Sequence, residues 1–262
     1  MIILNVAPAG MNSRINHYPK NVVNSITRRT MNFQQLPYSS DNFSYVIFGK
    51  HSALVIDGGA VESILDFVQK KKLRLTYITH THLHPDHNCG TRELLTRSGA
   101  TLLDGVYLSE HSQIELDEMP VRVYKTPGHT ADSVTFHVGN CLITGDTLFN
   151  GTIGNCFSGD IKAFYQSIKF LMAFPEDTLV YAGHDYLKYA MSFSRMIEPD
   201  NPDIDAYLKS YNPAHVCSLL GDELKVNPYL RFNDSRFIEM LKKKNLPIST
   251  EFQRWESVMS LG

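Results

Sequence analysis

The chain has 262 residues, of which 43% are hydrophobic and 20% charged, and this is the composition of an ordinary folded globular protein. Its 25 basic and 27 acidic residues leave a formal charge of −2, which argues against strongly anionic partners such as nucleic acid or an acidic membrane surface. No apolar run approaches the roughly 20 residues that a membrane-spanning helix requires, so we expect neither nucleic-acid nor membrane partners.

Cysteine spacing indicates the compartment. The cysteines contain no C-x-x-C pair, so they predict neither a zinc knuckle nor a disulfide framework; they are Cys89, Cys141, Cys156 and Cys217. Unpaired cysteines are typical of a reducing compartment, and we expect the cytoplasm. We interpret Cys89, which lies close to the candidate site described below, as a small buried thiol.

The first 30 residues differ from the rest of the chain. The first acidic residue is Asp41, and the basic residues before it are Arg14, Lys20, Arg28 and Arg29. We expect a short N-terminal extension or arm here. Acid-poor, arginine-containing segments also occur as organelle leaders, so a mitochondrial or other organellar location is the alternative to the cytoplasm.

Regular hydrophobic patterning begins near residue 31. Short runs rich in β-branched and aromatic residues predict strands over residues 32–36, 43–48, 53–56, 75–78, 101–104, 121–124, 133–138, 141–144 and 178–181. Apolar residues at helical spacing predict helices over residues 61–72, 91–98 and 160–173. This alternation predicts a mixed α/β region.

The pattern changes after Tyr186. We expect no further strand, and we predict helices over residues 187–197, 203–210, 235–244 and 251–259, separated by proline and asparagine. The chain is therefore divided into an N-terminal extension over residues 1–30, a catalytic α/β domain over 31–188 and a helical substrate-binding region over 189–262.

A dense set of potential metal ligands follows the strand predicted at 75–78. Four lie within six residues: His82, His84, Asp86 and His87. Proline is unfavourable inside a helix, so Pro85 favours an extended backbone here. Side chains alternate between faces in an extended backbone, which would turn His87 away from the other three ligands. So many imidazoles beside a carboxylate predict metal binding.

Three further ligand-type residues follow predicted strands. Each comes directly after a glycine, in the pairs Gly128-His129, Gly145-Asp146 and Gly183-His184. Glycine lets the backbone turn sharply and approach a bound group closely. Loops at one edge of a sheet can converge on one cleft. Seven ligands are enough for two metal ions, which need about four to five each when a carboxylate and a water are shared.

The order of these motifs resembles a known family. The His-x-His-x-Asp-His run is followed by Thr-Pro-Gly-His-Thr at 126–130, Gly-Asp-Thr-Leu-Phe at 145–149 and Gly-His-Asp-Tyr at 183–186, and this series resembles the metallo-β-lactamase fold. Asp-Asn-Phe-Ser-Tyr at 41–45, Glu-Pro at 198–199 and Asn-Pro-Tyr-Leu-Arg at 227–231 make the chain most similar to glyoxalase II, the hydroxyacylglutathione hydrolase family.

The resemblance covers the chain from about residue 31 to its C-terminus. It implies an α+β fold, a four-layer αββα sandwich with the site at one edge of the paired sheets and a C-terminal helical appendage. It implies one metal ion held by His82, His84 and His129. A second ion would be held by Asp86, His87 and His184, with Asp146 as the bridge between the ions.

Further roles follow from the same resemblance. Asp57 matches a position that orients a ligand imidazole. The implied cofactors are two divalent metal ions, with zinc expected and iron or manganese as alternatives, because histidine and aspartate suit all three. Asp86 and Asp146 are the expected catalytic carboxylates, and Asp86 is also suited to handle a proton.

The implied activity is hydrolysis of a small-molecule thioester. Two cations would lower the pKa of a bound water towards about 7, and the resulting hydroxide would attack the carbonyl. The implied substrate is an S-2-hydroxyacyl conjugate of glutathione or of a related thiol, which yields a hydroxy acid and the thiol. No serine or cysteine nucleophile is required.

The loop after Asp146 departs from the family pattern. The family usually has Cys-Gly-Lys/Arg-Phe-Tyr-Glu-Gly where this chain has Ile-Gly-Asn-Cys-Phe-Ser-Gly at 153–159. Asn155 therefore replaces the basic residue that would meet a glutathione carboxylate, and Phe157 replaces the tyrosine. Tyr186 keeps the tyrosine that contacts the thiol carrier. Loss of a charge-assisted contact costs about 1.5–3 kcal/mol, so either another base substitutes or the carrier is a different thiol.

Two alternatives stay open at this point. Persulfide dioxygenases share the fold and hold a single iron with two histidines and one aspartate, here His82 or a neighbour with His129 and Asp146. The complete second set of ligands favours the hydrolase over this oxidoreductase. The other alternative is a binding protein that keeps the metal site without catalysis, and the intact ligands argue against it.

Overall fold

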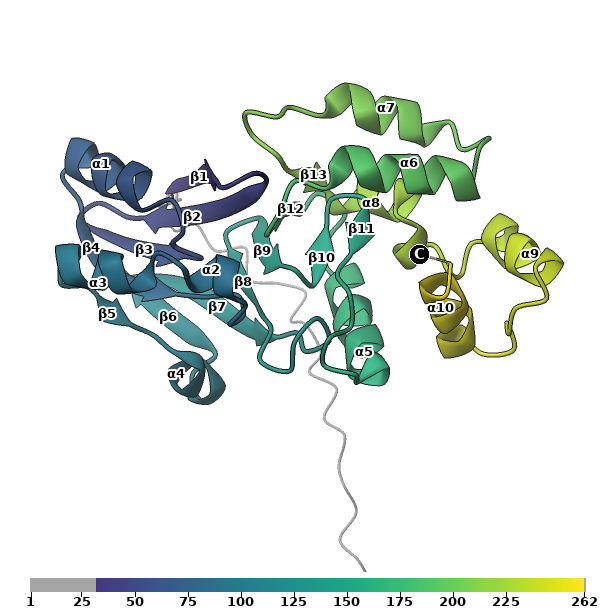
Figure 1. Cartoon of the computed structure of the whole chain (residues 1–262), viewed down its shortest axis with the longest axis horizontal. Helices are drawn as coiled ribbons and strands as arrows, with labels where there is room; N and C mark the ends of the chain where they lie inside the picture. The colour runs from purple at the N-terminus through teal and green to yellow at the C-terminus, as the bar shows by residue number, and fades with distance from the viewer. Residues whose placement is uncertain (1–31, 262) are drawn as a thin grey trace, which may run out of the picture.

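Residues 32–261 are described by a computed structural model of the chain, and they form four layers in the order α-β-β-α, with further helices at one end (Figure 1). The expected α+β sandwich with C-terminal helices is confirmed. The predicted N-terminal extension, and its alternative as a leader, lie outside the described residues. None of the helices in this part of the chain is long and apolar enough to cross a bilayer.

The first sheet has the strand order β1-β2-β3-β4-β5. Its strands are β1 (Asn32–Tyr38), β2 (Asn42–Phe48), β3 (Ser52–Ile56), β4 (Arg74–Thr79) and β5 (Thr101–Leu102). Helices α1 (Val61–Lys71) and α3 (Thr91–Ser98) cover its outer face (Figure 1). The pairs β3–β4 and β4–β5 are parallel, so the carboxyl ends of these strands meet at one edge of the sheet.

The second sheet has the order β13-β12-β9-β8-β7-β6. Its strands are β6 (Gln113–Leu116), β7 (Met119–Lys125), β8 (Val134–Val138), β9 (Cys141–Gly145), β12 (Leu179–Ala182) and β13 (Ser218–Leu219). Helix α4 (Gly105–Glu110) precedes this sheet, and α5 (Ile161–Met172) covers its outer face (Figure 1). Strands β10 (Leu148–Phe149) and β11 (Thr152–Ile153) form a separate hairpin.

Alternation along the strands separates the layers. On β2, Tyr45 and Ile47 face the second sheet, whereas Val46 faces α1 and α3. On β9, Ile143 faces the first sheet and Leu142 faces α5. Successive side chains of a strand point to opposite faces, and here both faces are buried, which explains the nearly continuous apolar runs.

The C-terminal region consists mainly of helices. They are α6 (Leu187–Ile197), α7 (Asp203–Ser210), α8 (Leu220–Val226), the 3₁₀ helix η1 (Pro228–Leu230), α9 (Ser235–Lys243) and α10 (Glu251–Met259). Trp255 of α10 is fully buried, and its ring meets Phe164 of α5 edge to face at 5.8 Å between centroids. The C-terminal region therefore shares its core with the outer face of the second sheet.

Several short elements escaped the sequence patterns. The expectation that no strand follows Tyr186 is wrong, because β13 pairs with β12. The patterns also missed α4, β6, α8 and the β10–β11 hairpin. These elements are too short for hydrophobic periodicity to distinguish them from loops. One local signal was present for the hairpin, since Asn150-Gly151 between pairs of strand residues is a typical two-residue turn.

The expected extended backbone around Pro85 is also wrong. Residues Pro85–Asn88 form a short helix, α2, in which Pro85 occupies the first helical position. Proline is well tolerated there, because the missing N–H would have no partner in any case. Asp86 and His87 therefore project from a helical turn rather than from opposite faces of a strand.

A buried carboxylate joins the C-terminal region to the β10–β11 hairpin. Glu223 of α8 has no exposed surface. It accepts hydrogen bonds from the backbone N–H of Gly151 (2.8 Å), the hydroxyl of Ser218 (2.6 Å), the side-chain amide of Asn227 (3.1 Å) and the hydroxyl of Tyr207. Asn227 also donates to the carbonyl of Thr152 at 3.1 Å. Helix α8 and the residue that follows it therefore hold the hairpin turn and the start of β11.

Replacing this carboxylate should destabilise the whole chain. Glu223→Ala leaves several buried donors without an acceptor, and each costs about 1–3 kcal/mol, so we expect the free energy of unfolding to fall by about 3 kcal/mol or more in urea denaturation. The matched control is Glu239→Ala, an exposed position on α9, which should change stability by less than about 0.5 kcal/mol. Equal losses in the two variants would contradict this role for Glu223.

Candidate metal centre

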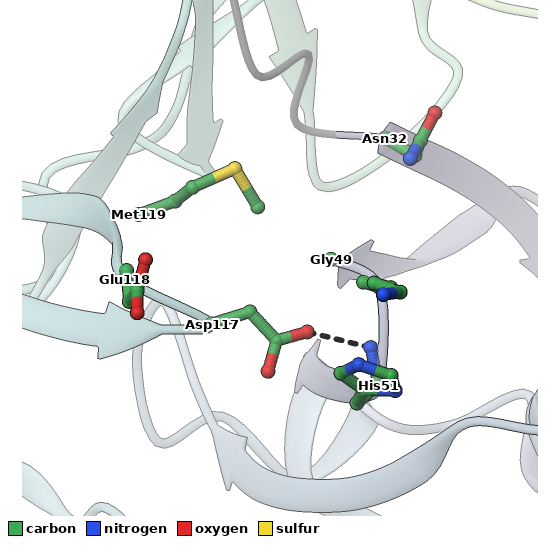
Figure 2. Close-up of a pocket in the computed structure, with 7 residues that line it drawn as sticks. Asn32, Gly49, His51, Asp117, Glu118 and Met119 are labelled. Atoms are coloured by element: carbon green, nitrogen blue, oxygen red, sulfur yellow. Dashed lines mark hydrogen bonds between the residues drawn. The ribbon is translucent and has the colours of Figure 1, made fainter.

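Two of the cavities lined by the described residues lie near opposite ends of β3. The larger, about 710 Å³, lies at the start of β3 and is bordered by the β2–β3 and β6–β7 turns, with Asp117 directed at the backbone of His51 (Figure 2). The other, about 410 Å³, is lined by five of the seven predicted ligands. The described residues that line the larger cavity include no such group of metal ligands. Its Asp117 carboxylate accepts the backbone N–H groups of His51 and Ser52.

The smaller cavity borders two groups of metal-ligand side chains. One group is His82, His84, His129 and Asp146, and the other is Asp86, His87 and His184; within each group the ligand atoms all lie within 4.8 Å of one another. The structure therefore brings together all seven residues that the sequence singled out. They come from the loop after β4, from α2 and from the segments that follow β7, β9 and β12.

Asp146 lies between the two groups. Its Oδ2 is 3.5 Å from His129 Nε2 in one group and 3.5 Å from His184 Nε2 in the other. Its Oδ1 is 3.4 Å from His87 Nε2, and this oxygen is buried without a hydrogen-bond partner. A buried carboxylate oxygen without a partner is costly, and a bound cation would satisfy it.

A buried carboxylate orients His87. Asp57 follows β3, has no exposed surface and adopts a positive φ of 54°. Its Oδ1 accepts the backbone N–H of Thr81 at 2.8 Å, and its Oδ2 accepts the hydroxyl of Thr81 at 2.7 Å and faces His87 Nδ1 at 2.9 Å. With Nδ1 held in this way, Nε2 of the ring is directed at the other ligands, the arrangement typical of metal-bound histidine.

Two other imidazoles are oriented by groups for which the sequence predicted no such role. His184 Nδ1 lies 2.8 Å from Asp41 Oδ1, in the turn between β1 and β2. His129 Nδ1 lies 3.0 Å from the backbone carbonyl of Asn155. A carboxylate or a carbonyl at Nδ1 accepts a hydrogen bond from the ring and leaves Nε2 free to bind a metal ion. Asp41 opens the motif at 41–45, but the motif gave it no role, because Asp41 is far from His184 in the sequence.

Asp86 is the most open member of its group, with 46% of its side chain exposed. Its Oδ2 accepts a hydrogen bond from the side-chain amide of Asn42 at 2.9 Å, and its backbone carbonyl accepts the hydroxyl of Tyr38 at 2.8 Å. Asn42 and Tyr38 are further residues that the sequence patterns did not identify. Both belong to the β1–β2 hairpin, which therefore supports one side of the site.

Glycines allow the ligands to approach one another. A Cβ atom on Gly183 would lie 2.1 Å from Asp146 Oδ1 and 2.8 Å from His87 Cε1. A Cβ on Gly145, which has a φ of 52°, would lie 2.4 Å from the hydroxyl of Thr81. Separations below 3.0 Å are not tolerated by real side chains, so the glycines before the ligands permit the close approach that the sequence predicted.

Burial and charge set the protonation of the ligands. Burial lowers the pKa of His82 to about 4, so this ring is neutral at pH 7 and can bind a metal. Burial would lower the pKa of His87, but Asp57 and Asp146 together raise it to about 11. Burial would raise the pKa of Asp146, but the adjacent imidazoles of His184 and His87 hold it below its usual range. A cation that binds beside His87 must therefore release a proton.

The predicted substrate contacts surround the same cavity, which is lined by Tyr186, Asn155 and Phe157 among others. The ring of Phe157 is 66% exposed and stands against His84 and His129 at centroid distances of 5.6 and 5.2 Å. Tyr186 stacks on His184 at 5.0 Å. The interpretation of Cys89 as a buried thiol is wrong. Cys89 follows the short helix α2 and is exposed.

Two protein-family models match the chain. The metallo-beta-lactamase superfamily model matches residues 40–103 and 98–184, and the model described as the hydroxyacylglutathione hydrolase C-terminus matches residues 185–258. A protein of Pseudoalteromonas translucida named hydroxyacylglutathione hydrolase is 30% identical over 240 residues, covering 85% of this chain and 93% of that protein. One of the same name from Tolumonas auensis is 35% identical, covering 76% and 85% of the two chains.

Solved structures share the fold. ETHE1 from Myxococcus xanthus superposes with a TM-score of 0.62 at 26% identity, covering 87% of this chain and all of that one. A metallo-beta-lactamase from Staphylococcus aureus superposes with a TM-score of 0.60 at 21% identity, covering 87% and 72% of the two chains. The second likeness concerns the fold alone.

Adding one methyl group at Gly183 should disrupt the metal centre while the fold survives. Gly183→Ala forces Asp146 and His87 apart, so we expect the metal content of the purified protein to fall by at least half, measured by inductively coupled plasma mass spectrometry, with an unchanged far-ultraviolet circular dichroism spectrum. Gly105→Ala is the control, because a Cβ there meets nothing within 4 Å. Full metal content in Gly183→Ala would refute the close approach.

Neutralising Asp57 should weaken metal binding. In Asp57→Asn, one of the two acceptor oxygens becomes an NH2 donor, so the amide cannot satisfy Thr81 N–H, the Thr81 hydroxyl and His87 together, and the imidazole loses the negative charge that orients it. Loss of such an orienting group typically costs about 10–100-fold in metal affinity, and competition with a chromophoric chelator measures it. Asp66→Asn on the exposed side of α1 is the control. Unchanged affinity in Asp57→Asn would show that His87 is positioned by other contacts.

Proposed function

Because the chain belongs to the hydroxyacylglutathione hydrolase family of the metallo-beta-lactamase superfamily, and is therefore a metal-dependent hydrolase, we propose that it cleaves thioesters with two divalent metal ions bound side by side. The observation that carries this proposal is the position of Asp146 between two complete ligand groups on one cavity. A single-ion enzyme would have no use for the second group.

The donor atoms fit such ions. Imidazole nitrogens of different residues face one another at 3.0 Å between His82 Nε2 and His84 Nδ1, 3.0 Å between His129 Nε2 and His84 Nδ1, and 3.2 Å between His87 Nε2 and His184 Nε2. Converging nitrogen lone pairs repel unless a proton or a cation lies between them. Nitrogen and carboxylate donors suit zinc, iron and manganese, and zinc is the ion that we propose.

The residues divide by role. His82, His84 and His129 would hold one ion, Asp86, His87 and His184 would hold the other, and Asp146 would serve both. When bound, the ions lower the pKa of water and stabilise negative charge on a carbonyl oxygen. Asp86 faces the cavity with its carboxylate partly open, so it takes a proton from the attacking water. The thiol leaves as a thiolate, which needs little protonation because thiol pKa values lie near 8.5.

The substrate that we propose is an S-2-hydroxyacylglutathione or the same acyl group on a related thiol, as the names of the relatives suggest. Tyr186, Asn155 and Phe157 are the proposed substrate contacts, since all three line the cavity. The oxidoreductase alternative needs one iron only, and the complete Asp86-His87-His184 group favours the hydrolase.

Metal removal and restoration test this function. Chelated protein should not hydrolyse S-lactoylglutathione or S-lactoyl-N-acetylcysteamine, and addition of zinc, manganese or ferrous iron should restore thiol release, measured with a thiol reagent. His184→Ala should lower the metal content from two ions per chain to one and kcat by about 100-fold or more, because the second group loses a ligand. Cys89→Ala is the control and should stay within about twofold of the wild type, since no thiol attacks the substrate.

An oxygen-consumption assay tests the oxidoreductase alternative. Protein that carries one iron per chain, consumes oxygen with a persulfide substrate and cleaves no thioester would replace the hydrolase with the oxidoreductase. Metal-loaded protein that is inactive in both assays would leave a metal-binding protein without catalysis.

A further inference from the structure

The cavity of the metal centre has one aromatic side, which we call the aromatic wall and define as Phe149, Tyr186, Tyr189, Phe193 and Tyr229. Tyr186, Tyr189 and Phe193 are spaced three and four residues apart, so they share one face at the start of α6 and along it. Phe149 meets Tyr186 at 5.0 Å, and Phe193 stacks on Tyr229 at 6.1 Å between ring centroids. Two ring pairs and Tyr189 therefore line one side of the same cavity, and Tyr186 brings this side next to His184.

This surface is open at its outer end. Tyr189 is 78% exposed and Tyr186 is 36% exposed, whereas Tyr229 and Phe149 are buried behind them. Contiguous exposed apolar surface that runs into a cavity is typical of a ligand-binding groove. Because the groove leads directly to the two ligand groups, its occupant is the molecule whose bond is cleaved there.

The cavity offers nothing to pair with an anionic arm outside the metal centre. No lysine or arginine occurs among the described residues that line it. The basic residues nearest to the wall in sequence are engaged elsewhere: the Lys188 ammonium lies 5.3 Å from the ring centroid of Tyr211, and Arg231 contacts Glu198 at 2.9 Å. Beyond the metal ligands, the polar lining consists of neutral groups, including Thr152, Asn155 and tyrosine hydroxyls.

We propose that the substrate is a thioester with an uncharged apolar arm, aromatic or branched aliphatic, that lies along the aromatic wall. This inference rests on the proposed thioester hydrolysis and names the kind of thioester. A flat ring gains offset or edge-to-face contacts with Tyr189, Phe193 and Tyr229, whereas a carboxylate in the same place would be desolvated without a partner. The arm is on the acyl or the thiol side of the carbonyl, and both cases share this chemistry.

Matched thioesters test the inference. S-lactoyl-N-acetylcysteamine is the reference, S-mandeloyl-N-acetylcysteamine replaces its acyl methyl group with phenyl, S-lactoyl benzyl mercaptan carries phenyl on the thiol side, and S-lactoylglutathione carries an anionic thiol arm. We expect at least one phenyl-bearing substrate to exceed the reference tenfold or more in kcat/KM and to exceed S-lactoylglutathione. A gain below tenfold on both sides, or S-lactoylglutathione as the best substrate, overturns the inference.

Substitutions on α6 test whether the aromatic wall causes the preference for a phenyl substrate. In Tyr189→Ser, the ratio of kcat/KM between the preferred phenyl substrate and the reference should fall at least threefold, and Tyr189→Phe should keep the ratio because the ring remains. Met196→Ser is the matched control, since Met196 is 70% exposed on the same helix but lies outside the cavity lining. If this kcat/KM ratio changes by less than threefold in Tyr189→Ser, the aromatic wall has no role in substrate preference.

A binding measurement separates this inference from the proposed function. If metal-loaded protein hydrolyses none of these thioesters, thioester hydrolysis fails, and the wall is judged by inert ligands alone. Isothermal titration calorimetry should then show S-benzyl-N-acetylcysteamine binding at least tenfold tighter than S-methyl-N-acetylcysteamine to the wild type, and this difference should fall at least threefold in Tyr189→Ser. Equal binding of the two thioethers would overturn the inference as well.

Discussion

The structure depends on one buried carboxylate. Asp57 has no exposed surface, and its two oxygens hold the backbone and hydroxyl of Thr81 on one side and the ring of His87 on the other. A charge at this depth is strongly destabilising unless every oxygen has a partner. The end of β3, the segment after β4 and the helix α2 are therefore tied together by the same group. The carboxylate that joins these segments of the first layer is thus also the one that orients a ligand imidazole.

The two sheets contribute to the site for a common reason. Each contributing strand carries buried apolar residues, and the chemistry-bearing residue comes just after the strand ends, as with His129 after β7 and His184 after β12. Packing the sheets face to face then brings these ends to one edge. Close approach completes the arrangement, because a Cβ at Gly183 or Gly154 would collide with Asp146 or His129. The short separations between the ligands therefore depend on glycine at these two positions.

Much of this was predictable from the sequence, for physical reasons that also explain the failures. Long strands such as β2 and helices such as α5 have enough residues for hydrophobic period to define them, and the glycine-ligand pairs are local signals. Two-residue elements such as β13 have no period, and Pro85 was misjudged because proline's effect depends on its position within a helix. Asp41 and Asn42 could not be assigned, since their roles arise from contacts with His184 and Asp86 that only the folded chain creates.

The attachment of the β10–β11 hairpin to Glu223 has a consequence for how such an enzyme diversifies. All seven ligand-type residues lie between positions 82 and 184, whereas α6 and η1 supply most of the aromatic wall. Substitutions on the exposed face of α6 can therefore change which molecule is accepted without moving an imidazole. Changes around Glu223 act differently, because the hairpin bound to it carries Phe149 and Thr152 into the same cavity. Gradual shifts in substrate range should accumulate on α6, and abrupt ones should require changes in α8.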